Sequence, residues 1–98
     1  MTRKKIAILG STGSIGKTLL KIVERDKKSF EIVLLSAEKN HNELLKQAKK
    51  FKVKNLVITN NKSFEILKNK IKKNKSINLF NNYYSFKKIF KKKIYYVM

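Results

Sequence analysis

Residues 10–16, with the sequence Gly-Ser-Thr-Gly-Ser-Ile-Gly, are the segment whose residue types and spacing point most clearly to chemistry. They follow a short apolar run and precede a stretch with helical periodicity, which predicts a glycine-rich turn between a strand and a helix. Gly10 suits the tight turn at the strand end, Gly13 lets a ligand approach the backbone, and Gly16 lets the helix pack closely on the strand. The N–H groups at the helix start and the positive end of its dipole favour a bound phosphate. The spacing therefore predicts a site for the pyrophosphate of a dinucleotide.

Three hydroxyl groups in the same loop offer further donors to a phosphate; they belong to Ser11, Thr12 and Ser14. The alternative is a purely structural turn in which a serine or threonine caps the helix and no ligand binds. Glycines at i, i+3 and i+6 between a strand and an amphipathic helix favour the binding interpretation.

The same loop is also close to the phosphate loop of nucleoside triphosphatases. Residues 11–18 read S-x-x-x-x-G-K-T, so Lys17 would reach the β- and γ-phosphates and Thr18 would hold magnesium. However, Ser11 replaces the first glycine of that motif. The only aspartate, Asp26, lies at the end of the first predicted helix and not at the end of a strand, where it could hold the metal. We therefore expect Lys17 and Thr18 to be ordinary residues of the first helical turn.

Residues 36–40, Ser-Ala-Glu-Lys-Asn, follow the second apolar run, where dinucleotide-binding proteins distinguish their cofactors. A carboxylate there binds the ribose 2′-hydroxyl of NAD, whereas a cation binds the 2′-phosphate of NADP. Glu38 offers the first and Lys39 the second, so spacing alone leaves both cofactors open. Lys39 could equally be one more solvated lysine, and Glu38 could support the start of the second helix.

The elements that position these residues alternate between strand and helix patterns. Strands are predicted at residues 5–9, 30–35, 55–59, 77–80 and 93–98. Helices are predicted after the glycine turn and at residues 44–51, 64–71 and 85–90. One face of the first helix is expected to carry Ile15, Leu19, Ile22 and Val23 into the core. This alternation predicts βαβ units, and hence an α/β, Rossmann-like doubly wound parallel sheet.

The chain ends on the apolar residues 94–98, with nothing after them to cover the strand they form. A parallel sheet needs cover on both faces. We therefore expect a fragment: a partial N-terminal domain over residues 1–98, with an incomplete sheet and without catalytic or C-terminal domains.

The formal net charge of +19 has two explanations. It could mark a surface for nucleic acid or anionic membranes, or it could reflect a lysine-rich composition spread over solvated faces. Only Arg3 and Arg25 are arginines, and the lysines are scattered through every segment, so the second explanation is favoured. We expect weak, salt-sensitive adhesion to polyanions and no specific nucleic-acid partner.

Residues 83–96 interleave aromatic residues and lysines, which could stack on single-stranded bases. The alternative, a short amphipathic helix followed by a buried strand, is favoured because Phe86 and Phe90 would share a helical face. The absence of cysteine suits the cytoplasm, and no apolar run is long enough to span a membrane.

The chain lacks an obvious set of catalytic groups. Its acidic residues fall on separate predicted elements with no pair at metal-ligand spacing: Glu24, Asp26, Glu31, Glu38, Glu43 and Glu65. The single histidine, His41, begins the second helix and is expected to be a surface or capping residue. We therefore expect binding and no turnover, and assign no catalytic or metal residue.

Residues 6–16, the strand at 30–35 and the pattern Ala37-x-Lys39-Asn40 closely resemble the N-terminus of 1-deoxy-D-xylulose-5-phosphate reductoisomerases. The run G-S-T-G-S-I-G is the specific part of the resemblance. The similarity is clear over residues 4–40 and looser beyond them. It would cover the whole chain but only the first part of such an enzyme.

The resemblance implies an NADPH-dependent enzyme of isoprenoid precursor synthesis that also uses a divalent metal, Mg or Mn. The family rearranges 1-deoxy-D-xylulose 5-phosphate and reduces the product to 2-C-methyl-D-erythritol 4-phosphate, and a homodimer is expected at full length. The resemblance implies that the cofactor diphosphate is lined by Thr12, Gly13, Ser14 and Ile15. It implies that Lys39 and Asn40 lie at the adenosine 2′-phosphate, which favours NADP. Many members have a small residue in place of Glu38, and we expect its carboxylate to point away from the phosphate.

Overall fold

The computed structural model describes residues 3–73, 76–82 and 96–97 of the 98-residue chain. Its strands are β1 (Lys4–Ile8), β2 (Phe30–Ala37), β3 (Asn55–Ile58), β4 (Asn78–Phe80) and β5 (Tyr96–Val97). Its helices are α1 (Ser14–Arg25), α2 (His41–Phe51) and α3 (Asn61–Lys70). The helix predicted at residues 85–90, and with it the question of bases stacking on residues 83–95, lies outside the described residues.

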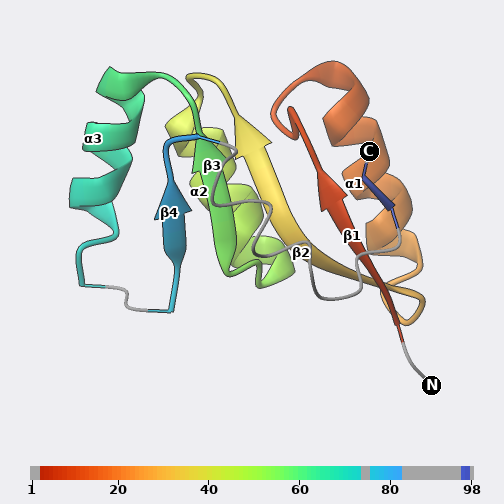
Figure 1. The fold of residues 1–98 in the computed structure, drawn as a ribbon. Coiled ribbons are helices and arrows are strands. Elements are labelled where there is room, and N and C mark those ends of the chain that lie inside the picture. The colour runs from red at the N-terminus through yellow and green to blue at the C-terminus, as the bar shows by residue number, and fades with distance from the viewer. Residues whose placement is uncertain (1–2, 74–75, 83–95, 98) are drawn as a thin grey trace.

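The strands form one sheet in the order β4-β3-β2-β1-β5, and every described pair is parallel (Figure 1). The chain moves outward from β1 to β4 and then returns to place β5 on the other side of β1. The strand order therefore reverses at β1, and such a reversal is where doubly wound sheets bind ligands, beyond the carboxyl ends of the strands. The predicted α/β, Rossmann-like parallel sheet is confirmed.

All three helices pack on the same face of the sheet. Leu20 of α1, Leu44 of α2 and Leu67 of α3 belong to one buried cluster. The strands contribute to that cluster Ile6, Ile8, Ile32, Leu35, Ala37, Leu56 and Ile58. A second cluster holds the fully buried Ala7, Leu34 and Val57. Burial on both faces explains why the central strands are almost continuously apolar.

Strand β2 contains one extra residue relative to β1. Ile6 pairs with Ile32, whereas the next residue of β1 pairs with Leu34, so Val33 bulges between them. The side-chain amide of Asn55 donates to the Val33 carbonyl at 2.9 Å. The bulge shifts the inward-facing alternation, which places Leu35 with Ile32 in the helix-side core.

Strand β2 also runs two residues beyond its predicted end at Leu35. Ser36 pairs with Val57 and Ala37 with Ile58, and both residues are buried. The hydroxyl of Ser36 concealed this extension in the sequence, because a polar residue is typical of a strand end.

The predicted inward face of α1 is wrong in part. Ile15 is 77% exposed and Ile22 is 54% exposed, whereas Gly16, Leu20 and Val23 are buried. Gly16 packs directly on the backbone after β1, and this contact fixes the rotation of the helix. Residues four and seven positions after Gly16 then point inward, while Ile15 and Ile22 lie on a neighbouring face.

This orientation gives a test of the core. We expect Leu20→Ala to lower the free energy of unfolding by about 3 kcal/mol, because truncating a buried leucine leaves a cavity in the core. The matched change Ile22→Ala should alter it by less than about 1 kcal/mol, since Ile22 lies half in solvent. Urea unfolding of the 98-residue chain measures both, and equal losses would contradict the orientation of α1.

Candidate functional site

The glycine loop leaves the carboxyl end of β1, beside the point where the strand order reverses (Figure 1). Gly10 has a φ of 65°, the left-handed conformation that glycine adopts without strain. The N–H of Gly13 donates to the Gly10 carbonyl at 3.0 Å, which closes the turn. Gly13 is the N-cap of α1, and no side chain caps the helix. The first N–H groups of α1 are thus available to an external acceptor.

Gly13 and Gly16 are glycines for different reasons. A Cβ at Gly16 would lie 2.4 Å from the Gly10 oxygen and 2.5 Å from the Ser11 Cα, so the close packing predicted for Gly16 is confirmed. A Cβ at Gly13 would meet only the Gly10 oxygen, at 3.4 Å, an ordinary contact. The chain's own packing therefore does not require glycine at position 13, and its φ of −79° suits any residue. What remains is the predicted role, an open approach for a ligand.

The residues predicted to line the diphosphate are gathered at this turn. Thr12 is half-buried, and Gly13, Ser14 and Ile15 are exposed at the start of α1. A hollow of about 230 Å³ beside them is lined by Ser14, Ile15, Thr18 and Leu19. The side chain of Ile15 therefore lines this hollow beside the loop and does not pack in the core.

Ser11 does not take the role predicted for its hydroxyl. It is fully buried, and its Oγ donates to Oε1 of Gln47 at 2.7 Å, with the Ser36 carbonyl at 3.3 Å. The expectation that Ser11 would offer its hydroxyl to a phosphate was wrong, because the loop is anchored through this group to α2 and β2. Thr12 and Ser14 remain as hydroxyl candidates.

The anchoring of the glycine loop by Gln47 and Ser36 was not predicted from the sequence. The Nε2 of Gln47 donates to the Ser11 carbonyl at 2.9 Å, and the N–H of Gly10 donates to the Ser36 Oγ at 3.0 Å. A signal for Gln47 was present, since its position places a polar side chain on the same helical face as the buried Leu44 and Ala48.

The residues predicted for the 2′-phosphate follow β2, which lies next to β1. Because parallel strands end at the same edge of a sheet, residues 38–40 and the glycine loop leave neighbouring positions of that edge. Glu38, Lys39 and Asn40 are all exposed. The Oδ1 of Asn40 caps α2 by accepting from the N–H of Glu43 at 3.2 Å.

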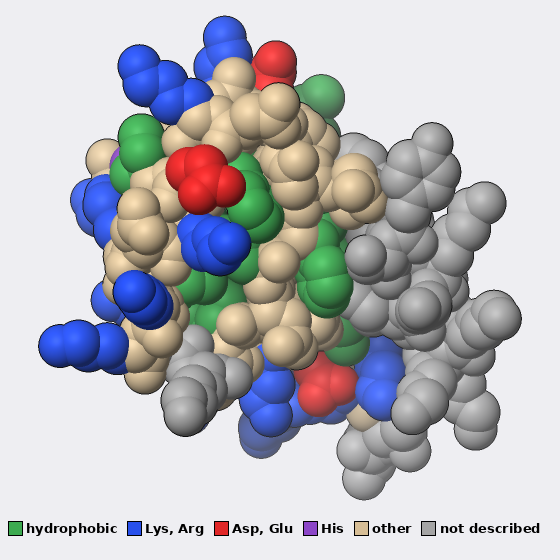
Figure 2. Space-filling model, turned by 60° about the vertical axis from the view of Figure 1, so that its left-hand side comes forward, with side chains coloured by type: hydrophobic (Ala, Val, Ile, Leu, Met, Phe, Trp, Pro, Cys, Tyr) green, Lys and Arg blue, Asp and Glu red, His purple; other side chains and the backbone are tan. Residues whose placement is uncertain are grey.

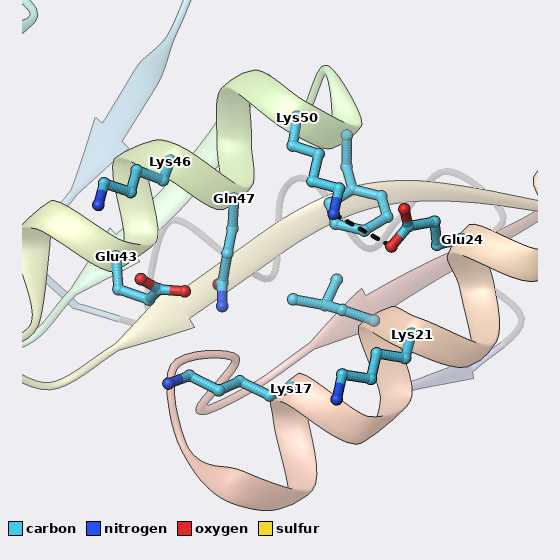
Figure 3. Close-up of a pocket in the computed structure, with 9 residues that line it drawn as sticks. Lys17, Lys21, Glu24, Glu43, Lys46, Gln47 and Lys50 are labelled. Atoms are coloured by element: carbon cyan, nitrogen blue, oxygen red, sulfur yellow. Dashed lines mark ion pairs between the residues drawn. The ribbon is translucent and has the colours of Figure 1, made fainter.

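Lys17 and Thr18 have the environment of ordinary helix residues. The Thr18 hydroxyl donates to the Ser14 carbonyl at 3.0 Å, so it is used within α1. Lys17 lines a groove of about 220 Å³ between α1 and α2, together with Lys21, Glu43, Lys46 and Gln47 (Figure 3). Lys17 is exposed and belongs to the first turns of α1, as expected of an ordinary helix residue.

Basic side chains do not gather into one patch on the face seen in Figure 2. In the groove, Lys50 pairs with Glu24 at 3.1 Å (Figure 3). Elsewhere, Arg3 pairs with Glu31 at 3.5 Å, and Asp26 accepts from the Ser29 hydroxyl at 2.9 Å. Each of these three acids thus has a partner of its own.

Among the described residues, no group of three or more His, Cys, Asp or Glu could hold a metal ion. The donor set that a hard divalent cation requires is thus not assembled in that part of the chain. In the same part of the chain, no helix has the length and apolar character needed to cross a membrane.

Known proteins match this chain over nearly its whole length. The family model of 1-deoxy-D-xylulose 5-phosphate reductoisomerase matches residues 6–98. The reductoisomerase of Pelagibacter ubique (strain HTCC1062) is 52% identical over 87 residues, which cover 89% of this chain and 22% of that protein. That of Buchnera aphidicola subsp. Schizaphis graminum is 42% identical over 72 residues, which cover 74% of this chain and 18% of that protein. The chain therefore spans about a fifth of the length of these relatives.

Solved structures agree with these matches. The Zymomonas mobilis 1-deoxy-D-xylulose 5-phosphate reductoisomerase, in complex with NADPH, has a TM-score of 0.73 and 28% identity, over 81% of this chain and 21% of that one. A DOX-P reductoisomerase in complex with magnesium has a TM-score of 0.85 over 98% of this chain and 24% of its own; at 22% identity it supports the fold alone. On the family match and the sequence identities, this chain belongs to the 1-deoxy-D-xylulose 5-phosphate reductoisomerase family.

Proposed function

We propose that residues 1–98 are the partial N-terminal domain that binds NADPH in a reductoisomerase. The observation that carries the proposal is the glycine loop at the carboxyl end of β1, where an uncapped helix start opens beside a glycine that the fold itself does not need. The reaction proposed for the whole enzyme is the rearrangement and reduction of 1-deoxy-D-xylulose 5-phosphate to 2-C-methyl-D-erythritol 4-phosphate.

The start of α1 fits the diphosphate of the cofactor. The backbone N–H groups of Ser14 and Ile15 belong to the first helical turn, which has no acidic residue to oppose an anion. The open side of Gly13 admits a phosphate close to the backbone. Thr12 and Ser14 would add hydroxyl donors, and the exposed Ile15 would cover the ligand from the side of the helix.

The exposed residues after β2 fit the adenosine 2′-phosphate. The Lys39 ammonium supplies positive charge, and the side-chain nitrogen of Asn40 remains available as a donor because only its oxygen is used in capping α2. The carboxylate of Glu38 would have to point away, since it would repel the phosphate. This arrangement favours NADPH over NADH.

When bound, NADPH supplies the hydride for the reduction. The described residues of this chain hold and orient the cofactor, and they do not form a metal centre. We place the metal ligands and catalytic groups in the rest of the reductoisomerase, which we expect to work as a cytoplasmic homodimer.

Replacing Lys39 tests the choice of cofactor. We expect Lys39→Ala to weaken NADPH binding about ten-fold, because a charge-assisted hydrogen bond to the 2′-phosphate is lost. NADH binding should stay unchanged, since NADH has no phosphate at that position. Titration by cofactor fluorescence measures both affinities.

Lys54→Ala is the matched control, because it removes the same charge from an exposed lysine just before β3. Lys54 lies at the amino end of its strand, whereas Lys39 follows the carboxyl end of β2. It should alter NADPH and NADH binding alike and only slightly. An equal loss of NADPH affinity in the two variants would mean that Lys39 acts only through the general positive charge.

A further inference from the structure

We infer that Gln47 is a positioning residue, which fixes the glycine loop in the conformation that receives the diphosphate. The inference rests on the cofactor site proposed above, and it concerns a side chain 36 residues away from the loop along the chain. Gln47 lies on α2, only 6% exposed, and reaches the fully buried Ser11 in the middle of the turn.

Both ends of the Gln47 amide are used on the same residue. Its Oε1 accepts from the Ser11 hydroxyl at 2.7 Å, and its Nε2 donates to the Ser11 carbonyl at 2.9 Å. Rotating the amide by half a turn would set Oε1 against the Ser11 carbonyl, two acceptors facing each other without a proton. The two contacts therefore hold Ser11 in one orientation, and glutamine fits because it carries a donor and an acceptor side by side.

Ser36 of β2 completes the anchorage from the other side. The N–H of Ser11 donates to the Ser36 carbonyl at 2.8 Å, and the N–H of Gly10 donates to the Ser36 hydroxyl at 3.0 Å. The backbone of residues 10 and 11 is thus bound to both β2 and α2. No buried side-chain nitrogen or oxygen in the described part of the chain lacks a partner, so this polar cluster is fully satisfied.

The loop needs such external contacts because two of its first four residues are glycines. Gly10 and Gly13 have the largest backbone freedom of any residue type, and Gly10 adopts positive φ. Ordering this segment only when the ligand arrives would reduce the affinity. By fixing Ser11, Gln47 removes that cost in advance and leaves the N–H groups of the following helix start in place for the phosphates.

The test compares variants of the 98-residue chain in binding NADPH, NADH and ADP-ribose, which share the diphosphate. Gln47→Met fills the same space without either hydrogen bond, and we expect it to weaken all three ligands by a common factor of about ten. The NADPH-to-NADH ratio should stay as in the wild type, because the 2′-phosphate contacts are unchanged. Ser11→Ala removes the hydroxyl contacts with Gln47 at 2.7 Å and with the Ser36 carbonyl at 3.3 Å but keeps the bond from Nε2 of Gln47 to the Ser11 carbonyl. It should give a smaller loss of the same kind.

Amide hydrogen exchange separates positioning from general stability. In Gln47→Met we expect faster exchange at residues 10–13, with β3 protected as in the wild type. The control Ser63→Ala removes a buried hydroxyl on α3 and should change neither the loop nor the affinities. If Gln47→Met does not fold, Ser11→Ala decides the question by the same measurements.

Two results would overturn the inference. Wild-type affinity for all three ligands in a folded Gln47→Met would show that Gln47 does not position the loop. Where that variant does not fold, wild-type affinity in Ser11→Ala would show that the hydroxyl contact with Gln47 does not contribute to ligand binding, which contradicts the inference. If the rate of amide hydrogen exchange in Gln47→Met rises equally in β3 and in the loop, Gln47 contributes only to the general stability of the chain. A wild-type chain that binds none of the three ligands would instead refute the proposed function, and the positioning role with it.

Discussion

Gly16→Ala should lower the free energy of unfolding by about 3 kcal/mol, the upper end of the usual cost of overpacking. The added Cβ would lie 2.4 Å from the Gly10 oxygen and 2.5 and 2.8 Å from two backbone atoms of Ser11. None of these is the end of a flexible side chain, so α1 would have to move away from β1 and withdraw Leu20 from the core. Urea unfolding followed by circular dichroism measures the loss.

Gly13→Ala is the matched control, with the same added methyl group three residues earlier. Its Cβ would meet only the Gly10 oxygen at 3.4 Å, and its φ is ordinary for alanine. We expect a loss of no more than about 1 kcal/mol, the cost of a poorer N-cap. A Gly16→Ala variant as stable as Gly13→Ala would mean that the contact between α1 and the end of β1 is wrongly described.

Gly13→Leu should lower the affinity for NADPH at least about 100-fold while leaving the chain folded. The side chain would project from an exposed position at the helix start and fill the space that a diphosphate must occupy to reach the N–H groups. Calorimetric titration with NADPH gives the affinity, and circular dichroism establishes that the fold is retained.

Gly13→Ala again provides the intermediate case, with a smaller loss expected from one methyl group. Tight NADPH binding that survives Gly13→Leu would show that the cofactor does not sit on this loop. The proposed residues 12–15 would then have to be abandoned, even though the family assignment would stand.

The sheet could be predicted because each strand can be recognised from its own residues. Runs such as residues 55–58 are apolar throughout, and the helices between them have helical periodicity, so the alternation gives a parallel α/β sheet without knowledge of contacts. The glycine loop could be predicted for the same reason. The spacing of its glycines and the patterns of the strand before it and the helix after it all lie within one short stretch of sequence.

The orientation of α1 could not be read in the same way, because its apolar residues form two overlapping stripes. Periodicity selects Ile15, Leu19 and Ile22 as readily as Leu20 and Val23. The choice depends on Gly16, whose small size lets the helix approach the Gly10–Ser11 backbone. That is a contact between segments and not a property of the helix alone.

The anchoring of the loop depends in the same way on distant partners. Ser11 looked like a phosphate donor because of its place in the loop, yet Gln47 lies 36 residues later and takes its hydroxyl. A buried glutamine on an apolar helical face shows that a polar partner exists, but not which one. The bulge at Val33, which Asn55 covers, is a further pairing of this kind.

The most direct test of the central claim is a titration of the 98-residue chain with NADPH and NADH at rising salt concentration. A cofactor site predicts saturable one-to-one binding, tighter for NADPH than for NADH, with the preference for the 2′-phosphate surviving at salt levels that screen the overall charge of +19. Binding that disappears with salt, treats the two cofactors alike and is matched by any nucleic acid would contradict the claim, and would describe a basic surface that adheres to polyanions.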